Sequence, residues 1–236
     1  MRLDRALALT GCSRTQAKAM IAAGRVQVSG AVVRDPGLNV EISAVHLDGA
    51  PIDADAELYL MLNKPAGVIT ATEDKRLPTV ISLLPEKYAR RRIGPVGRLD
   101  RDVTGLVLLT TDGQLAHRLI SPRWKAEKLY RAVCEGCLDE EDAARFAEGL
   151  VLSDFTALPA KLDILSAGET SMADVTLSEG KFHQVKRMFA AVGHPLLSLL
   201  RLRIGCVTLD PALAPGEFRP LTAEEISGLK QMSGLL

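Results

Sequence analysis

The chain has 236 residues, of which 47% are hydrophobic and 25% are charged, and its formal net charge at pH 7 is zero. This composition is typical of a globular protein with one large or two modest domains, and it excludes a disordered chain. No apolar run approaches the roughly 18 residues of a membrane span, and the stretch Ala6–Leu9 is too short for the core of an export signal. We therefore expect a cytoplasmic protein, not associated with a membrane, whose four cysteines are free thiols.

The charges are unevenly distributed along the chain although they cancel in total. Residues 1–34 contain six Lys or Arg and one Asp, whereas residues 35–57 contain six Asp or Glu and no Lys or Arg. Residues 86–101 are basic again, with six Lys or Arg and two acidic residues. Two basic segments separated by an acidic one can follow the phosphates of a nucleic acid, but a solvated charged surface would have the same pattern.

The first elements of the chain predict a small helical module. Ser13 followed by Gln16 is a capping box at the start of a helix with an apolar stripe, and Gly24 ends that helix. Arg14 and Lys18 lie four residues apart on this helix, on a face away from the apolar stripe. A basic helix face of this kind suits the backbone of structured RNA.

A hairpin and a linker complete the first module. Residues 25–28 alternate like a strand, Ser29-Gly30 predicts a tight turn, and residues 31–33 return along it. Residues 48–57 contain three Asp, one Pro and few apolar side chains, so we interpret them as a linker. We therefore expect a helix–helix–hairpin domain at residues 1–57, followed by a larger domain at residues 58–236.

The second domain predicts many strands on short connections and few helices. The strand-like segments are 58–62, 68–72, 106–110, 128–133, 160–165, 173–177 and 197–201. Helices are expected at 114–121, at 140–148 after the cap Asp139, and at 183–192 before Gly193. This order is typical of an α+β fold with a mostly antiparallel sheet.

The loop that leads into the strand-like residues 106–109 carries the most informative group of charges. Residues 93–97 contain two glycines and a proline, so they are not a helix interior. Asp100 follows on this connection, where a packed strand can hold a catalytic group in place. The neighbouring Arg98 and Arg101 would keep Asp100 ionised. Taken alone, the loop is compatible with a surface ion pair and equally with a carboxylate that attacks a sugar carbon.

This loop resembles the central motif of the pseudouridine synthases through Gly97-Arg98-Leu99-Asp100, Thr104-Gly105-Leu106 and Thr111-Asp112-Gly113. Four further segments, in the family's order, are similar to the branch that modifies ribosomal RNA: 61–67, 127–130, 179–188 and 213–221. The last two are most similar to members that act on small-subunit (16S) rRNA, and less similar to those that act on large-subunit (23S) rRNA. The N-terminal residues 2–30 resemble a small RNA-binding domain that is named after a ribosomal protein. The resemblance implies a mixed sheet and the isomerisation of a uridine in rRNA to pseudouridine.

The resemblance also implies roles for single residues. Asp100 is the carboxylate that acts near the anomeric carbon of a uridine flipped out of its stack. Tyr130 matches the family's active-site tyrosine, whose ring can stack on uracil and whose hydroxyl can take part in proton transfer. Lys186 matches the basic residue that pairs with the aspartate, and Arg187 remains the alternative because only one of the two can face the site. Arg98 matches an arginine that fills the gap left by the flipped base.

Other residues are expected to bind RNA or to serve the structure. RNA contacts are expected from Arg98, Arg14, Lys18, Arg187 and Arg201. Asp102 is expected to be structural. The reaction involves no redox change, so the resemblance implies no cofactor and no metal; Cys134 and Cys137 have Cys-x-x-Cys spacing, but a zinc site needs a second pair of ligands. The implied partner is ribosomal RNA or a partly assembled ribosomal subunit, bound by a monomer.

Two other classes of function stay open. A noncatalytic RNA-binding assembly factor would use the first domain alone. A glycoside or nucleoside hydrolase would use Asp100 together with Asp102, but side chains at i and i+2 of an extended stretch point to opposite faces. The sequence does not identify the uridine that would be modified.

Overall fold

The computed structural model describes residues 1–10, 12–52, 57–124 and 126–236. These residues form two compact units, one of Met1–Leu58 with Leu84–Ile93 and one of Tyr59–Leu83 with Gly94–Leu236. The segment Leu84–Ile93, which the sequence places in the second domain, thus belongs to the first unit. It contains the short helix α3 (Glu86–Ala89), and Arg90 Nη1 donates a hydrogen bond of 2.8 Å to the Cys12 carbonyl. Residues 53–56 of the expected linker lie outside the described residues.

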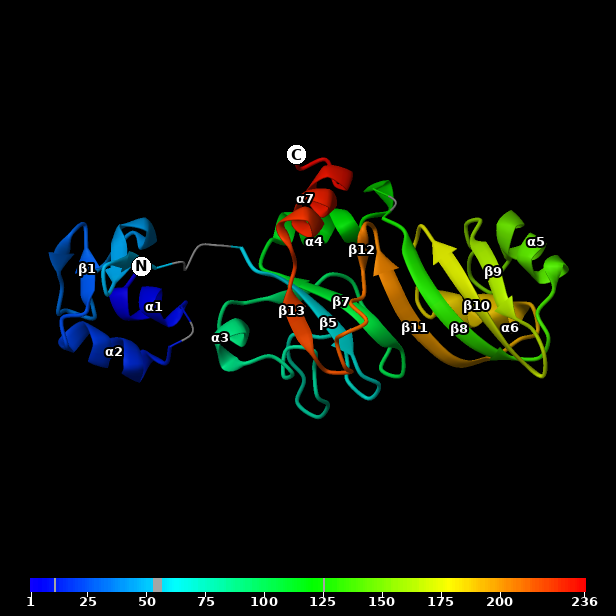
Figure 1. The fold of residues 1–236 in the computed structure, drawn as a ribbon, viewed down its shortest axis with the longest axis horizontal. Helices are drawn as coiled ribbons and strands as arrows, with labels where there is room; N and C mark the ends of the chain where they lie inside the picture. Colours follow the sequence, from blue (N-terminus) through cyan, green and yellow to red (C-terminus); the bar gives the residue numbers. More distant parts are fainter. Residues whose placement is uncertain (11, 53–56, 125) are drawn as a thin grey trace. The chain divides into compact units, whose positions relative to one another are not determined.

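The first unit confirms the helix–helix–hairpin prediction (Figure 1). Its helices are α1 (Leu3–Ala8) and α2 (Arg14–Ala22), and η1 (Ile42–Ala44) is a short 3₁₀ turn. Its strands are β1 (Val26–Val28), β2 (Ala31–Val32), β3 (Val45–Leu47) and β4 (Ala50–Pro51). Among the described residues they pair in the order β2-β1-β3-β4, so a second hairpin occupies the start of the segment expected to be a linker.

Local sequence signals account for the elements of the first unit. Ser13 Oγ accepts a hydrogen bond of 3.1 Å from the Gln16 amide, and the Ser13 amide donates one of 2.8 Å back to Gln16 Oε1. The hairpin turn places both Ser29 (φ 50°) and Gly30 (φ 82°) in the left-handed region, as a type I′ turn requires. Leu7 of α1 and Ile21 of α2 are fully buried in the core that the helices share with the sheet.

The second unit is built on one long sheet, which confirms the α+β prediction (Figure 1). Its main strands are β5 (Tyr59–Lys64), β7 (Thr104–Thr110), β8 (Lys128–Glu135), β9 (Lys161–Ser166), β10 (Thr170–Leu177), β11 (Leu196–Ile204) and β13 (Phe218–Pro220). Across the described residues they follow the order β13-β5-β7-β11-β8-β10-β9, and the short strands β6 (Gly94–Pro95) and β12 (Val207–Thr208) pair with β7 and β11. The β7–β11 pair is parallel and the other pairs are antiparallel, so the sheet is mixed and mostly antiparallel.

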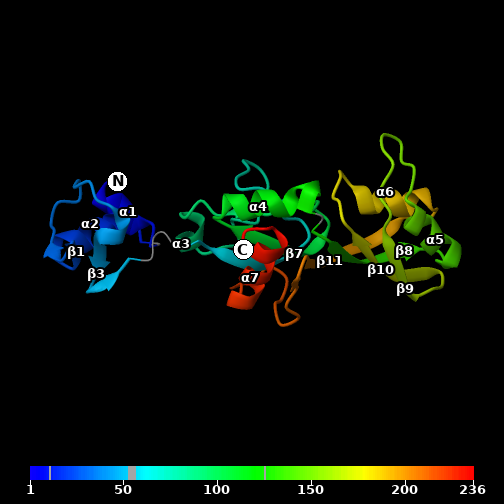
Figure 2. The ribbon, with the colours of Figure 1, turned by 90° about the horizontal axis from the view of Figure 1, so that it is seen from above.

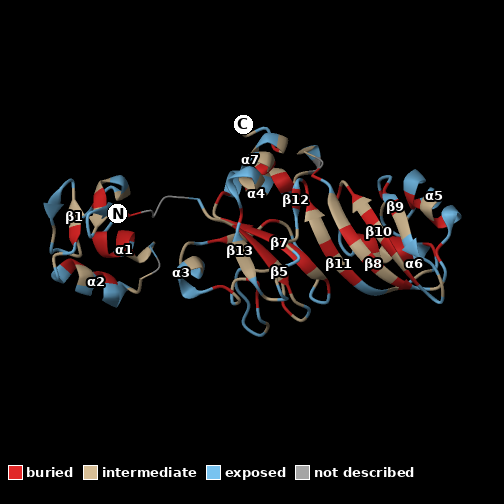
Figure 3. Ribbon diagram, in the orientation of Figure 1, coloured by how far each residue is buried: buried red, intermediate tan, exposed pale blue. Residues whose placement is uncertain are grey.

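Helices cover this sheet where its strands are most buried. They are α4 (Gly113–Ile120), α5 (Glu140–Glu148), α6 (Gln184–Ala191) and α7 (Ala223–Met232), with a 3₁₀ turn η2 (Pro122–Trp124). Figure 2 shows α4 and α6 on the same side of the sheet, and Figure 3 shows that β5 and β7 are buried along most of their length. The expected helices α4, α5 and α6 are confirmed, whereas α7 was not predicted. Within the described parts of the chain, no helix has the length and apolar character needed to cross a membrane.

The prediction of a strand at 68–72 is wrong. In the structure, Ile69 forms only an isolated bridge to Thr79. The hydroxyl of Thr70 donates to the Leu99 carbonyl (2.9 Å) and accepts from the Leu99 amide (3.1 Å). The segment therefore supports the loop that carries Asp100 through the Thr70 side chain, while its backbone bonds only at Ile69, to the Pro78 carbonyl and the Val80 amide (both 3.0 Å), which is a bridge and not a ladder.

A glycine permits the parallel junction beside that loop. Gly105 has φ +99°, and a Cβ at this position would overlap the Arg201 carbonyl oxygen of β11. Only glycine combines this conformation with so close an approach of two backbones. The junction of β7 and β11 brings the Asp100 loop next to strand β11.

Candidate active site

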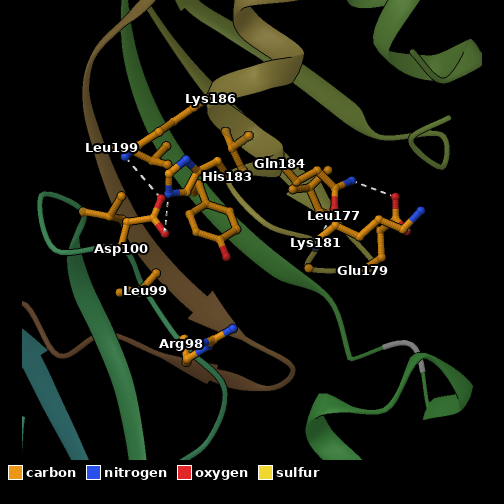
Figure 4. A pocket seen from close by; sticks show the side chains of 14 residues that line it. Arg98, Leu99, Asp100, Leu177, Glu179, Lys181, His183, Gln184, Lys186 and Leu199 are labelled. Atoms are coloured by element: carbon orange, nitrogen blue, oxygen red, sulfur yellow. Dashed lines mark hydrogen bonds and ion pairs between the residues drawn. The ribbon is translucent and has the colours of Figure 1, made fainter. Parts of the chain in front are cut away.

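Asp100 lies in a small cavity between the loop before β7 and the segment before α6. Its carboxylate is 29% exposed, with Oδ2 at 3.2 Å from Lys186 Nζ and Oδ1 at 3.5 Å from His183 Nε2. Figure 4 shows the side chains of Lys186 and His183 converging on Asp100. The charges thus come from residues more than 80 positions away in the sequence, brought together by the packing of α6 beside β11.

Lys186 is shared by two carboxylates. Its Nζ donates to both oxygens of Asp102, at 2.7 and 2.9 Å, in addition to its contact with Asp100. Burial opposes the charge of Lys186, but the hydrogen bonds to Asp102 and Asp100 outweigh it and raise the pKa of Lys186. The hydrogen bond from Lys186 in turn lowers the pKa of Asp102.

The expectation that Asp100 and Asp102 point to opposite faces is therefore wrong. Residues 100–103 are not extended, because the Val103 amide donates to the Asp100 carbonyl (3.2 Å) and closes a turn. A turn places side chains two residues apart on the same side of the chain, so one lysine contacts both carboxylates.

The neighbouring arginines do not pair with Asp100 in the structure. Arg101 donates from Nε to the Gly67 carbonyl at 3.2 Å. Arg98 is exposed and lines the cavity, and in Figure 4 it lies apart from the Asp100 carboxylate. The ion-pair partner of Asp100 among the described residues is thus Lys186, with His183 Nε2 also close to the carboxylate, instead of the expected Arg98 and Arg101.

Lys64, a buried lysine, anchors the Asp100 loop through hydrogen bonds to backbone carbonyls. The sequence did not predict this contact. Lys64 at the end of β5 has no exposed surface, and its Nζ donates to the carbonyls of Pro65 (3.0 Å), Arg101 (3.2 Å) and Val103 (2.7 Å). Burial lowers the pKa of Lys64 to about 8, although the nearby carboxylates of Asp102 and Asp100 oppose this shift. A lysine at the end of an otherwise apolar strand was the only sequence signal for this contact.

Tyr130 lies in the same cavity as Asp100. It is on β8, is 8% exposed, and lines the cavity together with Leu177 of β10 and Leu199 of β11. The ring therefore forms part of the wall against which a planar group beside Asp100 would pack.

A second pair of side chains, also missed in the sequence, fixes the segment before α6. Gln184 is 3% exposed and donates from Nε2 to Glu179 Oε1 at 2.7 Å. The same Glu179 oxygen accepts from the Leu158 amide (2.8 Å), and Gln184 Oε1 accepts from the Lys181 amide (2.9 Å). His183 lies between these anchors with φ 50°, a left-handed conformation that is uncommon for a residue other than glycine. The anchors hold the segment in the conformation that presents His183 and Lys186 to Asp100.

Arg187 and Arg201, two of the residues expected to contact RNA, are engaged with other protein groups in the structure. Arg187 is directed to Asp154 and Ser153 Oγ and stacks over the Phe155 ring at 4.9 Å, so it does not face Asp100. Arg201 is only 3% exposed and donates from Nε to the Leu106 carbonyl at 2.8 Å. Because β11 lies between β7 and β8, the guanidinium of Arg201 is enclosed, and the RNA contact expected of it stays a prediction.

Two further residues expected to contact RNA, Arg14 and Lys18, lie on the first unit. Arg14 and Lys18 are exposed on α2, whereas Ala17 and Ile21 of the same helix are buried. Arg14 also lines a hollow of about 580 Å³ whose other basic side chains are Arg5, Arg90, Arg91 and Arg92. Such a cluster of guanidinium groups suits phosphates.

The cysteines carry no sign of a metal or redox site. All four are free thiols, and the described residues contain no group of three or more His, Cys, Asp or Glu that could hold a metal ion. Cys134 is buried at the end of β8, and burial raises its pKa. A thiol with a raised pKa is a poor nucleophile.

Known proteins are similar to almost the whole chain in sequence and fold. It matches the family described as RNA pseudouridylate synthase over residues 58–191, and the S4 domain over residues 1–46. Ribosomal small subunit pseudouridine synthase A of Escherichia coli (strain K12) is 44% identical over 234 residues, 97% of this chain and 100% of the relative. The "Uncharacterized RNA pseudouridine synthase YtzG" of Bacillus subtilis (strain 168) is 43% identical over 237 residues, 98% of this chain and 99% of the relative. A crystal structure of a pseudouridylate synthase, 38% identical, superimposes with a TM-score of 0.69 over 97% of this chain and 99% of that chain.

Proposed function

Because the chain belongs to the RNA pseudouridylate synthase family and carries an S4 domain at its N-terminus, we propose that it isomerises a specific uridine of small-subunit (16S) rRNA to pseudouridine. The relatives named ribosomal small subunit pseudouridine synthase A match almost the whole chain, which supports the small-subunit target. A ribosomal substrate also supports the cytoplasm as the place of reaction. The substrate is ribosomal RNA, free or in a partly assembled subunit.

Asp100 is the proposed nucleophile. The reaction detaches uracil from its ribose, turns the base over and rejoins it through carbon 5, so it needs a positioned carboxylate near the anomeric carbon. The carboxylate of Asp100 is half-buried and held from two sides by Lys186 and His183. Lys64 also fixes the loop, because its Nζ donates hydrogen bonds to the Arg101 and Val103 carbonyls. A nucleophile that is already oriented loses little entropy when it attacks.

The other site residues bind and place the base. Tyr130, on the wall of the cavity, stacks on the uracil ring and can exchange a proton through its hydroxyl. The base must leave its stack to reach Asp100, and the exposed guanidinium of Arg98 fills the vacated position. Lys186 orients Asp100 and is itself held by Asp102. We propose a monomer, because these side chains all belong to the second unit and one copy of the chain completes the site.

The observation that carries this proposal is the meeting of Asp100, Lys186 and Tyr130 at one cavity. The test uses small-subunit rRNA transcribed with uridine tritiated at carbon 5. We expect the wild-type protein to release tritium, and Asp100→Asn to release none while its affinity for the rRNA stays within about threefold. The matched control is Asp163→Asn, which removes an exposed carboxylate from β9; it should behave as wild type.

The alternatives give different products in the same assay. Release of free uracil would indicate a hydrolase, and binding without any release would indicate an assembly factor. Activity on large-subunit (23S) transcripts alone would move the target to that subunit. A fully active Asp100→Asn protein would refute Asp100 as nucleophile.

A further inference from the structure

A second, wider groove adjoins the cavity at Asp100. Its volume is about 740 Å³, and it shares with the cavity the lining residues Arg98, Leu99, Asp100, Gly180, Lys181 and His183. The two hollows therefore adjoin each other at the Asp100 loop. An RNA strand that places one nucleotide in the cavity must continue past this groove with the next.

The groove carries an exposed aromatic ring. Phe182 is 72% exposed, and it stacks on His183 with ring centroids 3.7 Å apart and an angle of 19° between the planes. One face of the Phe182 ring is therefore covered by the imidazole, and its exposure leaves the other face open. Single exposed apolar side chains are common on protein surfaces, but Phe182 differs because it lines the groove beside Asp100 and is held there by His183, so its open face is available to a planar ligand.

The charges of the groove favour RNA as that ligand. Its described lining contains the exposed cations Arg98 and Arg101, and Asp100, which pairs with Lys186, is its one acidic residue. Lys181 also lines the groove but pairs with Glu179 at 3.6 Å. A basic groove with a flat aromatic ring is the usual arrangement for holding single-stranded nucleic acid, because cations attract phosphates and the ring stacks on a base.

We propose that the open face of Phe182 stacks on the nucleobase adjacent to the uridine seated at Asp100. Flipping the uridine removes a stacking partner from its neighbour, and Phe182 replaces that partner on the protein. His183 supports the ring from behind, and its own position is fixed by the Glu179–Gln184 pair. This inference rests on the proposed function, since it requires a uridine at Asp100.

The test measures tritium release from small-subunit rRNA transcripts as a function of RNA concentration. Phe182→Ala and Phe182→Leu should raise KM about 5- to 150-fold, the range expected for losing one base–aromatic stack, with kcat less affected. Phe182→Tyr keeps the ring and should restore most of the loss. Leu165→Ala is the matched control, because Leu165 is 50% exposed on β9 away from the groove; it should leave KM unchanged.

A binding measurement separates this inference from the proposed function. The chain has one tryptophan, Trp124, so Phe182→Trp adds a single new fluorophore in the groove. Its emission should be quenched by the rRNA transcript more than that of the wild-type protein. A wild-type protein that releases no tritium would overturn the proposed function, whereas the quenching would still report stacking at residue 182.

Three results would overturn the stacking role. They are a wild-type KM in Phe182→Leu, an equal loss in Phe182→Tyr and Phe182→Leu, and a fall in kcat at constant KM. Equal quenching of the Phe182→Trp and wild-type proteins would overturn it as well.

Discussion

The buried charge of Lys64 should make the stability of the protein depend on pH in a predictable direction. Lys64 is fully buried, and three backbone carbonyls accept hydrogen bonds from its Nζ. The informative substitution is Lys64→Met, because methionine retains much of the side-chain volume and carries no titrating group. Every other titrating group is common to both proteins, so comparing the two isolates the contribution of Lys64.

The magnitude follows from the pKa of Lys64. Burial lowers this pKa from 10.5 to about 8, which corresponds to about 3.5 kcal/mol at about 1.4 kcal/mol per pKa unit. Below pH 8 both the folded and the unfolded state hold the proton, and the folded state bears the full desolvation cost. Between pH 8 and 10.5 the folded state releases the proton while the unfolded state keeps it, so the free energy of unfolding rises with pH.

Urea denaturation of both proteins at pH 7, 8, 9 and 10 measures this effect. We expect the free energy of unfolding of the wild type, relative to Lys64→Met, to increase by about 2 to 3 kcal/mol from pH 7 to pH 10. A difference that is constant over this range would refute the reasoning, since it would mean that Lys64 has the same pKa in both states. A difference that decreases with pH would mean that the carbonyls and carboxylates outweigh burial.

The remaining predictions concern the charges that serve the site and the RNA. Asp102→Asn should lower kcat about two- to fivefold with KM near the wild-type value, because Lys186 loses a charged partner that holds it against Asp100, and an ion pair to a carboxylate that is 73% exposed is worth at most about 1 kcal/mol. Single-turnover tritium release measures this, and an unchanged kcat would show that Asp102 does not position Lys186. Substituting both Arg14 and Lys18 by Gln should weaken rRNA binding and reduce the slope of log affinity against log salt by about 1.5, with kcat unchanged. Filter binding at several salt concentrations measures this slope, and an unaltered slope would exclude phosphate contacts by α2.

The electrostatic arrangement explains why the site needs support from several elements. Two carboxylates and two lysines lie around one short turn, and both lysines are withdrawn from water to different degrees. Lys186 keeps a raised pKa through its carboxylate partners, whereas Lys64 meets mainly neutral carbonyls and has a lowered one. The pKa values of these two neighbouring lysines shift in opposite directions because their partners differ, and burial alone does not explain the difference.

The sequence by itself determined the elements whose signals are local. The Ser13–Gln16 capping box, the Ser29–Gly30 turn and the cap at Asp139 each act within a few residues, and the structure contains all of them. The resemblance of the motif around Asp100 to a known family identified the candidate catalytic loop, but the local sequence did not show which side chains contact Asp100. The expected strand at 68–72 failed because its backbone finds a partner only at Ile69, which bridges to Thr79, and no local pattern shows whether a partner strand is present.

Only the tertiary structure decided which charges meet. Lys64 reaches the Arg101 and Val103 carbonyls across 37 and 39 residues of chain, and Lys186 reaches Asp102 across 84. These distances close only when β7 pairs with both β5 and β11, and the same pairing encloses Arg201, which composition alone would place on the surface. Side-chain period and capping fix elements over a few residues, whereas the partner of a charge depends on the register between strands that are distant in the sequence.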